Sequence, residues 1–123
     1  YVRDGSIFVN DGMEEKKVME VAEIALIGGH NLENILLAIG AAWMEKIHLS
    51  DIRKAIMEFK GTAYHLELVR NLNGVKYYND TAATTPESAI AGINSFQNPP
   101  VLICGGSDKK LDMKEMAMAI AAS

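Results

Sequence analysis

The fold is decided where a predicted strand gives way to a predicted helix, at Tyr77-Tyr78-Asn79-Asp80-Thr81-Ala82-Ala83-Thr84-Thr85-Pro86. Before this stretch, residues 74–78 alternate and carry β-branched and aromatic side chains, which favours a strand. After it, Thr84 or Thr85 can cap a helix whose first turn holds Pro86. An Asn-Asp pair therefore follows a strand and precedes a helix, and in open α/β sheets ligands bind at that edge. The alternative is an ordinary connection with Asx-turn chemistry.

The flanking pattern extends this interpretation over the second half of the chain. Residues 65–72 alternate up to Asn73-Gly74, which is a strong hairpin signal. A helix is predicted over 86–96, and another over 113–122. Between them, residues 101–104 form a continuous apolar run of the sort found in strands buried on both faces. The order strand, helix, strand, helix from Val75 onward predicts a parallel βαβ sheet.

The first half is predicted to hold short strands followed by two helices. A strand over 7–9 precedes a turn at Asn10-Asp11-Gly12, whereas residues 18–27 fit either a strand or a helix. A helix with one broad apolar face runs through 32–43, and Ser50 is a good N-cap for a second helix. The apolar face of this second helix would contain Ile52, Ala55, Ile56 and Phe59. Helical patterning then stops, which predicts a domain boundary at residues 60–63.

Composition limits the classes of protein. The 123 residues are 49% hydrophobic and carry a net charge of −4, with acidic and basic residues mixed throughout. This pattern favours neither a nucleic-acid partner nor a membrane surface, and no apolar run approaches the roughly 18 residues of a membrane span. The single cysteine, Cys104, excludes an internal disulfide and fits a reducing, cytoplasmic location. The chain opens without Met on an alternating apolar pattern, which indicates a piece of a longer protein.

Four stretches have residue types suited to binding. Asn31 and Asn34 lie one turn apart at a helix start, where two carboxamides could read a purine edge, unless Asn31 is simply an N-cap. His30 and Glu33 lack further His or Cys nearby, so a metal site is not predicted there.

The other three stretches lie beyond the boundary. His65 is either a polar ring at a hinge or a surface residue. Asp80 could orient a ribose or cap the next turn. The loop Gly105-Gly106-Ser107-Asp108-Lys109 offers backbone N–H groups and an ammonium to an anion. It has neither the Walker A spacing nor Gly-x-Gly-x-x-Gly.

In order along the chain, four motifs together resemble the Mur ligases of peptidoglycan synthesis, and most of all the branch that adds D-glutamate to UDP-N-acetylmuramoyl-L-alanine. They are Gly29-His30-Asn31-x-x-Asn34, Gly61-x-x-x-His65-x-Glu67, Asn79-Asp80-Thr81-x-Ala83-Thr84-x-Pro86 and Gly105-Gly106-x-Asp108-Lys109-x-x-Asp112. The resemblance implies an α/β fold. Residues 1–60 would end a central ATPase domain, and residues 61–123 would begin a Rossmann-like C-terminal ligase domain.

The resemblance also implies an activity. ATP phosphorylates the carboxylate of the UDP-linked substrate, and the amine of D-glutamate attacks the acyl phosphate. The cofactors would be ATP and Mg²⁺, with the P-loop, the Mg²⁺ ligands and a modified lysine upstream. No catalytic residue would lie in this chain, which alone would be inactive, and the intact protein would be a monomer.

Motif position assigns roles to six residues. Asn31 and Asn34 would contact adenine, and His65 and Asp80 would contact the nucleotide, with Asp80 near the ribose. The incoming D-glutamate would be bound by Thr84 and Lys109.

Two positions depart from the family pattern. Leu66 stands where the family usually has Arg, and Ala82 stands where Lys is common, so two cations are missing unless Arg70, Lys76 or Lys110 replaces them. The alternatives are a sister Mur or folate-type amino acid ligase and a non-catalytic nucleotide-binding module. A Gly-x-x-Gly-Lys-Thr loop upstream would favour a ligase over the module.

Overall fold

A computed structural model describes residues 1–122 as a mixed α/β chain made of small sheets and helices. It divides into two compact units, the first being Tyr1–Lys60 and the second starting at Gly61. This division lies at the position where the sequence changes from helical to strand patterning. The assignment of the two units to a central ATPase domain and a C-terminal ligase domain stays a prediction.

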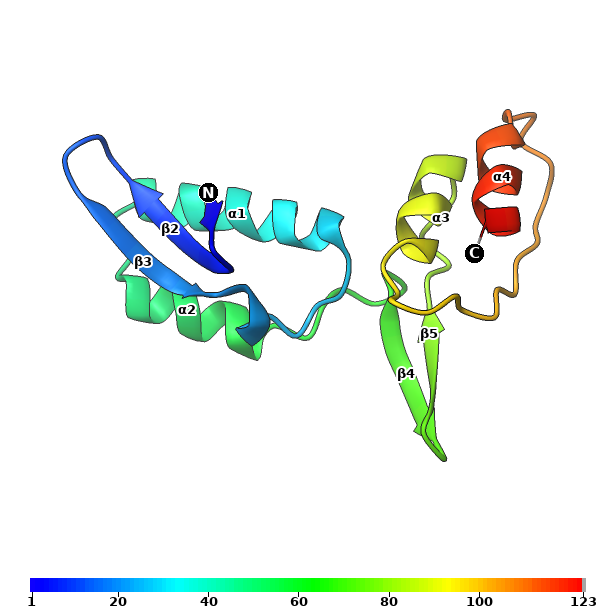
Figure 1. Cartoon of the computed structure of the whole chain (residues 1–123), viewed down its shortest axis with the longest axis horizontal. Coiled ribbons are helices and arrows are strands. Elements are labelled where there is room, and N and C mark those ends of the chain that lie inside the picture. Colours follow the sequence, from blue (N-terminus) through cyan, green and yellow to red (C-terminus); the bar gives the residue numbers. More distant parts are fainter. Residues whose placement is uncertain (123) are drawn as a thin grey trace. The chain divides into compact units, whose positions relative to one another are not determined.

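The first unit contains an antiparallel sheet with the strand order β1-β2-β3, formed by Val2–Arg3, Ser6–Asn10 and Glu15–Glu20 (Figure 1). The predicted turn after β2 is confirmed, because the Asn10 side-chain oxygen accepts a hydrogen bond from the Gly12 N–H at 2.7 Å. Gly12 adopts a φ of 90°, which glycine tolerates without a steric penalty. Residues 18–27 are not one element: β3 ends at Glu20, and the 3₁₀ turn η1 follows at Val21–Glu23.

Two helices, α1 (Gly29–Met44) and α2 (Leu49–Glu58), complete this unit and share its core with β2 and β3. Each fully buried isoleucine contributes roughly 1.5–3 kcal/mol through removal of apolar surface from water. The core consists of Ile7, Val9, Val18, Met19, Ile35, Ile39 and Ile52.

The start of α2 differs from the prediction. The helix begins at Leu49 and His48 takes the cap position without a side-chain hydrogen bond, so Ser50 as the N-cap is wrong. The His48 carbonyl already accepts the first helical hydrogen bonds, from the N–H groups of Asp51 and Ile52. Phe59 follows the helix with an extended backbone and is 48% exposed, so it is not part of the buried face.

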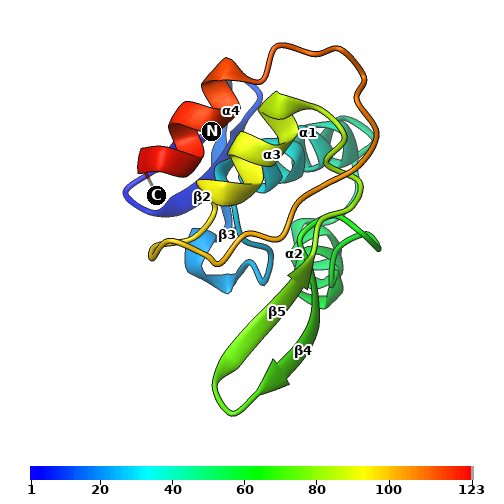
Figure 2. The same cartoon turned by 90° about the vertical axis from the view of Figure 1, so that its right-hand side faces the viewer.

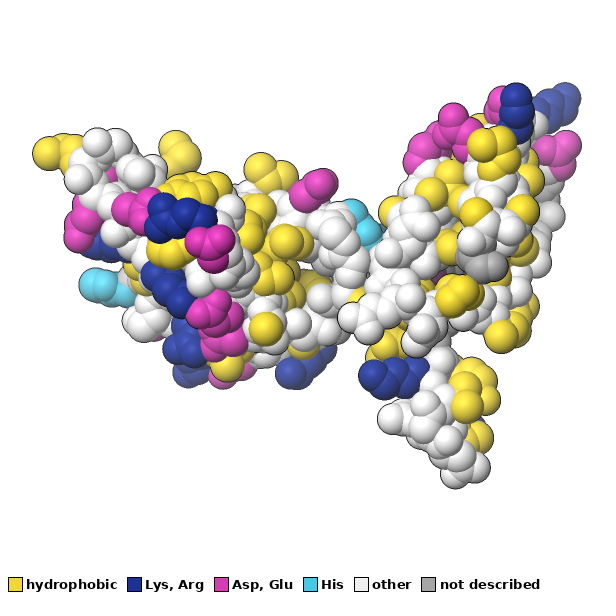
Figure 3. Space-filling view, viewed as in Figure 1, with side chains coloured by type: hydrophobic (Ala, Val, Ile, Leu, Met, Phe, Trp, Pro, Cys, Tyr) yellow, Lys and Arg dark blue, Asp and Glu magenta, His cyan; other side chains and the backbone are white. Residues whose placement is uncertain are grey.

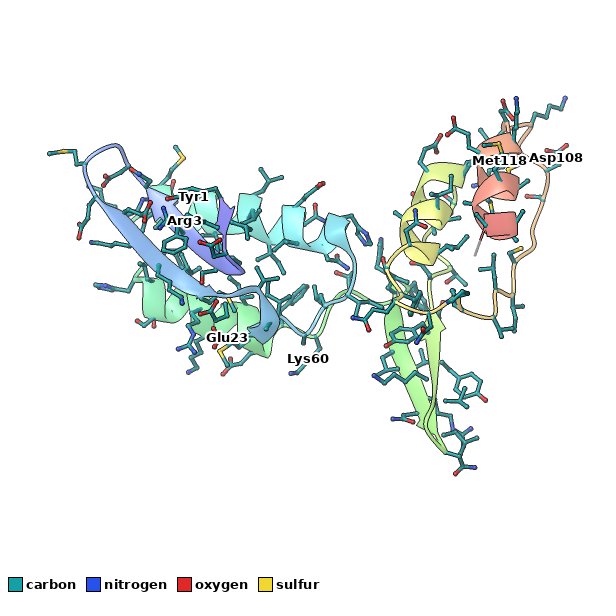
Figure 4. The ribbon with its side chains drawn as sticks, in the orientation of Figure 1. Tyr1, Arg3, Glu23, Lys60, Asp108 and Met118 are labelled. Carbon is teal, nitrogen blue, oxygen red and sulfur yellow. The ribbon has the colours of Figure 1, made fainter. Side chains whose placement is uncertain are left out.

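Acidic and basic side chains alternate over the face of the first unit that Figure 3 shows. Arg3 pairs with Glu15 at 2.5 Å, and in Figure 4 Arg3 lies beside Tyr1, whose hydroxyl also donates to Glu15. Glu23 in η1 pairs with Arg53 in α2. The Arg53 guanidinium, with a smaller effect of the Glu20 backbone N–H, holds the pKa of the Glu23 carboxyl below its ordinary value of 4.5.

This lowered pKa predicts a pH-dependent contribution to stability. A carboxyl whose pKa is lower in the folded state stabilises the fold above its unfolded pKa, and the contribution is lost as pH falls through the folded value. We expect Glu23→Gln to lower the thermal unfolding midpoint at neutral pH, and the difference from wild type to shrink as pH falls below 4.5. Glu33→Gln is the control, because Glu33 is exposed on α1 and forms no ion pair among residues 1–122. A difference that stays constant at all pH values would contradict the ion pair.

The second unit begins with the predicted hairpin, formed by β4 (Glu67–Leu72) and β5 (Val75–Asn79) in antiparallel pairing. Its two-residue turn has φ values of 51° at Asn73 and 84° at Gly74, as a type I′ turn requires. Helices α3 (Pro86–Ile93) and α4 (Lys114–Ala122) lie side by side, and the hairpin projects away from them (Figures 1 and 2).

The predicted parallel sheet is not formed. Every strand pair within residues 1–122 is antiparallel, and residues 101–104 form no strand. Val101 and Ile103 are each 95% exposed. A strand buried on both faces needs neighbours that satisfy its backbone N–H and C=O groups and cover its side chains, and β5 is paired with β4 alone. Smaller differences are that α3 ends at Ile93 instead of 96, and that α4 starts at Lys114 instead of 113.

Candidate functional site

Asn31 and Asn34 both lie in the first turns of α1, where a three-residue spacing puts them on one side of the helix. Gly28 occupies the cap position with a φ of 95°, so the alternative that Asn31 is the N-cap is wrong. Asn31 is half-buried, and its Nδ2 donates to the Ile27 carbonyl at 2.7 Å. Its side-chain oxygen makes no hydrogen bond within residues 1–122 that would compete with a ligand, and Asn34 is exposed.

Asp80 follows β5 directly and anchors the turn that leads into β4. Its Oδ1 accepts a hydrogen bond from the Leu66 backbone N–H at 2.9 Å. Close by, the Ala82 N–H donates to the Tyr64 carbonyl at 3.1 Å. These two bonds clamp residues 64–66 to residues 80–82, so His65 and Asp80 are brought close together within the second unit.

The clamped turn has an unusual backbone. Tyr64 and Leu66 adopt left-handed φ values of 68° and 47°, which cost about 1–2 kcal/mol per non-glycine residue. Besides the clamp, the Glu67 carboxylate holds the turn by accepting from the Tyr64 N–H at 2.9 Å. His65 between them is exposed, with Nδ1 3.0 Å from the Ala63 carbonyl oxygen. A strained turn that several bonds maintain is typical of functional sites.

Of the two threonines before α3, Thr85 is the cap, since its side chain accepts a hydrogen bond from the Ser88 N–H at 3.3 Å. Thr84 is exposed, and its hydroxyl has no hydrogen-bond partner in the described part of the chain. The Asx turn is also confirmed: Asn79 Oδ1 accepts from the Thr81 N–H at 3.1 Å. Capping therefore uses Thr85 and leaves Thr84 open to a ligand.

Lys109 lies in the exposed loop that leads into α4, next to Asp108, which Figure 4 labels. Asp108 accepts from the Lys110 N–H at 2.7 Å, and Asp112 accepts from the Lys114 N–H at 2.9 Å. Both carboxylates thus accept hydrogen bonds from backbone N–H groups two residues further along the chain. Lys109 itself forms no ion pair with Asp108, Asp112 or any other carboxylate within residues 1–122.

Two neighbours of Asp80 were not predicted from the sequence. One is the backbone N–H of Leu66. The other is Gly92 in α3, where an added Cβ would lie only 2.7 Å from Asp80 Oδ2. The signal for Gly92 was present, because an isolated glycine inside a helical pattern usually has a packing reason.

The described residues also form a groove outside the predicted site. A shallow groove on the first unit contains none of the six predicted site residues and is lined by Asn10, Asp11, Lys16, Trp43, Met44, Lys46, Ile47, His48, Leu49 and Ser50. Residues 1–122 contain no group of three or more His, Cys, Asp or Glu arranged to hold a metal ion. None of the helices described is long and apolar enough to cross a membrane.

Comparison with known proteins tests the resemblance. The UDP-N-acetylmuramoylalanine–D-glutamate ligase of Thermoanaerobacter sp. (strain X514) is 38% identical over 119 residues, which are 97% of this chain and 26% of that protein. The resemblance to this Mur ligase is confirmed. The enzymes of the same name from Roseiflexus sp. (strain RS-1) and Clostridioides difficile (strain 630) are 48% identical over 99 residues and 40% identical over 116. These alignments cover 80% and 94% of this chain, and 21% and 26% of those proteins.

The chain therefore spans about a quarter of the length of the D-glutamate ligases that it matches. No protein-family model matches it.

The two departures from the Mur ligase pattern leave the backbone contacts around Asp80 in place. At position 66 the contact with Asp80 comes from the backbone N–H, which Leu supplies as well as Arg. At position 82 the contact with Tyr64 is likewise made by the backbone. The clamp that positions Asp80 therefore does not depend on the two missing cations.

Proposed function

We propose that this chain is part of an ATP-dependent ligase that adds D-glutamate to UDP-N-acetylmuramoyl-L-alanine through an acyl phosphate. The observation that carries the proposal is the identity of 38–48% to ligases of that name, over 80–97% of the chain. Residues 1–60 would end the central ATP-binding domain, and residues 61–123 would begin the Rossmann-like domain. In line with the resemblance, we place the protein in the cytoplasm, as a monomer.

The chemistry explains what this chain has to contribute. A carboxylate is a poor electrophile, so it must be activated, and charge developing on oxygen must be stabilised. ATP supplies the phosphoryl group. Mg²⁺ would accompany ATP, with ligands that the resemblance places upstream of this chain.

Several described side chains keep hydrogen-bonding groups that could bind a nucleotide. Asn31 keeps an acceptor oxygen, and Asn34, one turn on, offers both donor and acceptor groups to an adenine edge. Asp80 is half-buried, and each of its oxygens can accept two hydrogen bonds, so the Leu66 contact leaves capacity for ribose hydroxyls. His65 is exposed on the turn that the Leu66 N–H joins to Asp80.

The residues present also fit a dicarboxylate amino acid. Lys109 has no carboxylate partner in the described chain, and Thr84 has an unengaged hydroxyl. A charge-assisted pair between the Lys109 ammonium and a D-glutamate carboxylate would bind and orient the incoming substrate.

The test is a ligation assay on the full-length protein that contains this chain. With ATP and UDP-N-acetylmuramoyl-L-alanine, we expect ADP release to depend on D-glutamate and to yield the coupled product by mass spectrometry. L-Lysine and L-glutamate are the control amino acids. Turnover with another amino acid and not with D-glutamate would favour a sister ligase. ATP binding without ADP release under any condition would favour the non-catalytic module.

A further inference from the structure

Gly92 lies in the next-to-last position of α3 and is buried against the carboxylate of Asp80. A Cβ added to Gly92 would lie 2.7 Å from Asp80 Oδ2 and 3.8 Å from its Cγ. This separation from an oxygen is shorter than carbon atoms of real side chains adopt, so one of the two groups would have to move. Glycine is among the least favourable residues within a helix, and its presence here has this steric reason.

The carboxylate of Asp80 is thus held from two sides. Oδ1 accepts from the Leu66 N–H at 2.9 Å, and Oδ2 lies against the bare backbone of Gly92. The Leu66 side chain closes the same space, with Cδ2 3.8 Å from the position of the added Cβ. The three residues come from the turn before β4, the end of β5 and α3, and they fix one orientation of the carboxylate.

We propose that Gly92 is a positioning residue for the nucleotide-binding carboxylate of Asp80, an inference that rests on the function proposed above. The lack of a side chain at Gly92 allows α3 to pack directly on Asp80. A methyl group there is accommodated most easily by rotation of the short Asp80 side chain, because the alternative is displacement of a packed helix. Rotation removes Oδ1 from the Leu66 N–H and changes the direction in which the carboxylate meets a nucleotide.

The experiment uses the full-length ligase with Gly92→Ala. We expect the KM for ATP to rise three- to tenfold, with the KM for D-glutamate changed less than twofold. In a ¹⁵N-leucine-labelled sample, the amide signal of Leu66, assigned by its loss in Leu66→Val, should shift and exchange faster with solvent. Gly40→Ala is the matched control, because Gly40 is also helical and an added Cβ there meets nothing within 4 Å. It should change neither KM nor the Leu66 signal.

A double mutant separates positioning from general damage. In an Asp80→Ala background the carboxylate that would clash with a Cβ at position 92 is absent. Gly92→Ala should then raise the KM for ATP less than 1.5-fold further, and it should no longer lower the thermal unfolding midpoint. Equal effects of Gly92→Ala in both backgrounds would overturn the inference, as would an unmoved Leu66 signal.

Different results would reject the positioning role of Gly92, the nucleotide role of Asp80 and the ligase activity. If Asp80→Ala raises the KM for ATP and Gly92→Ala does not, the positioning role is wrong while the function of Asp80 stands. If Asp80→Ala itself leaves the KM unchanged, the nucleotide role of Asp80 is wrong and the positioning role is overturned with it. A protein without ligase activity would reject the proposed function, and the Leu66 signal would still report whether Gly92 orients the carboxylate.

Discussion

Replacing Asp80 with alanine should raise the KM for ATP of the full-length ligase at least tenfold, which corresponds to about 1.4 kcal/mol. Asp80 follows β5 and is clamped to the turn that carries His65. Its carboxylate is therefore pre-oriented, and removal of a pre-oriented acceptor costs more than removal of a mobile one. The measurement is steady-state ADP release as a function of ATP concentration, with the other two substrates saturating. An unchanged dependence on ATP would reject the assignment.

Asp80→Asn is the matched control for this prediction, because Asn keeps the oxygen that accepts from the Leu66 N–H and loses the charge. If the alanine variant weakens ATP binding only by releasing the turn, Asn should restore both the unfolding midpoint and the KM. If the carboxylate itself binds the nucleotide, Asn should restore the midpoint and leave the KM raised.

Replacing Lys109 with alanine should raise the KM for D-glutamate roughly 30- to 150-fold, about 2–3 kcal/mol for a lost charge-assisted hydrogen bond, with the KM for ATP nearly unchanged. Lys109 is exposed, and within residues 1–122 it has no ion-pair partner. Its neighbours Asp108 and Asp112 accept backbone hydrogen bonds of their own loop. The ammonium therefore makes no ion pair that stabilises the described fold. Its loss should raise the KM for D-glutamate and have little effect on stability.

Lys114→Ala is the control for Lys109, since it removes the same charge from an exposed position at the start of α4. The Lys114 backbone bond to Asp112 does not involve its side chain and should persist. We expect less than a twofold change in either KM. Equal, small effects of the two substitutions would contradict a specific carboxylate contact at Lys109 and leave it a solvated loop residue, worth under about 1 kcal/mol.

The local elements could be predicted from the sequence, because neighbouring residues encode them. Asn73-Gly74 supplies the two positive φ values of a type I′ turn, and the hairpin formed as predicted. Pro86 was placed correctly in the first turn of α3, with Thr84 and Thr85 both open as its cap, and Asn31 and Asn34 were placed correctly at the start of α1. The order of the motifs was also enough to indicate the ligase resemblance, which the comparisons confirmed.

Features that depend on residues far apart in the chain could not be predicted from the sequence, because folding alone brings those residues together. The apolar run at 101–104 reads as a buried strand, yet a strand exists only where a neighbouring strand satisfies its backbone, and here the run stays exposed. The setting of Asp80 likewise depends on Leu66 and Gly92, which lie 14 and 12 positions away in opposite directions. Sequence patterns report which residue types are present. The direction of a carboxylate is set by the backbone groups that folding brings against it.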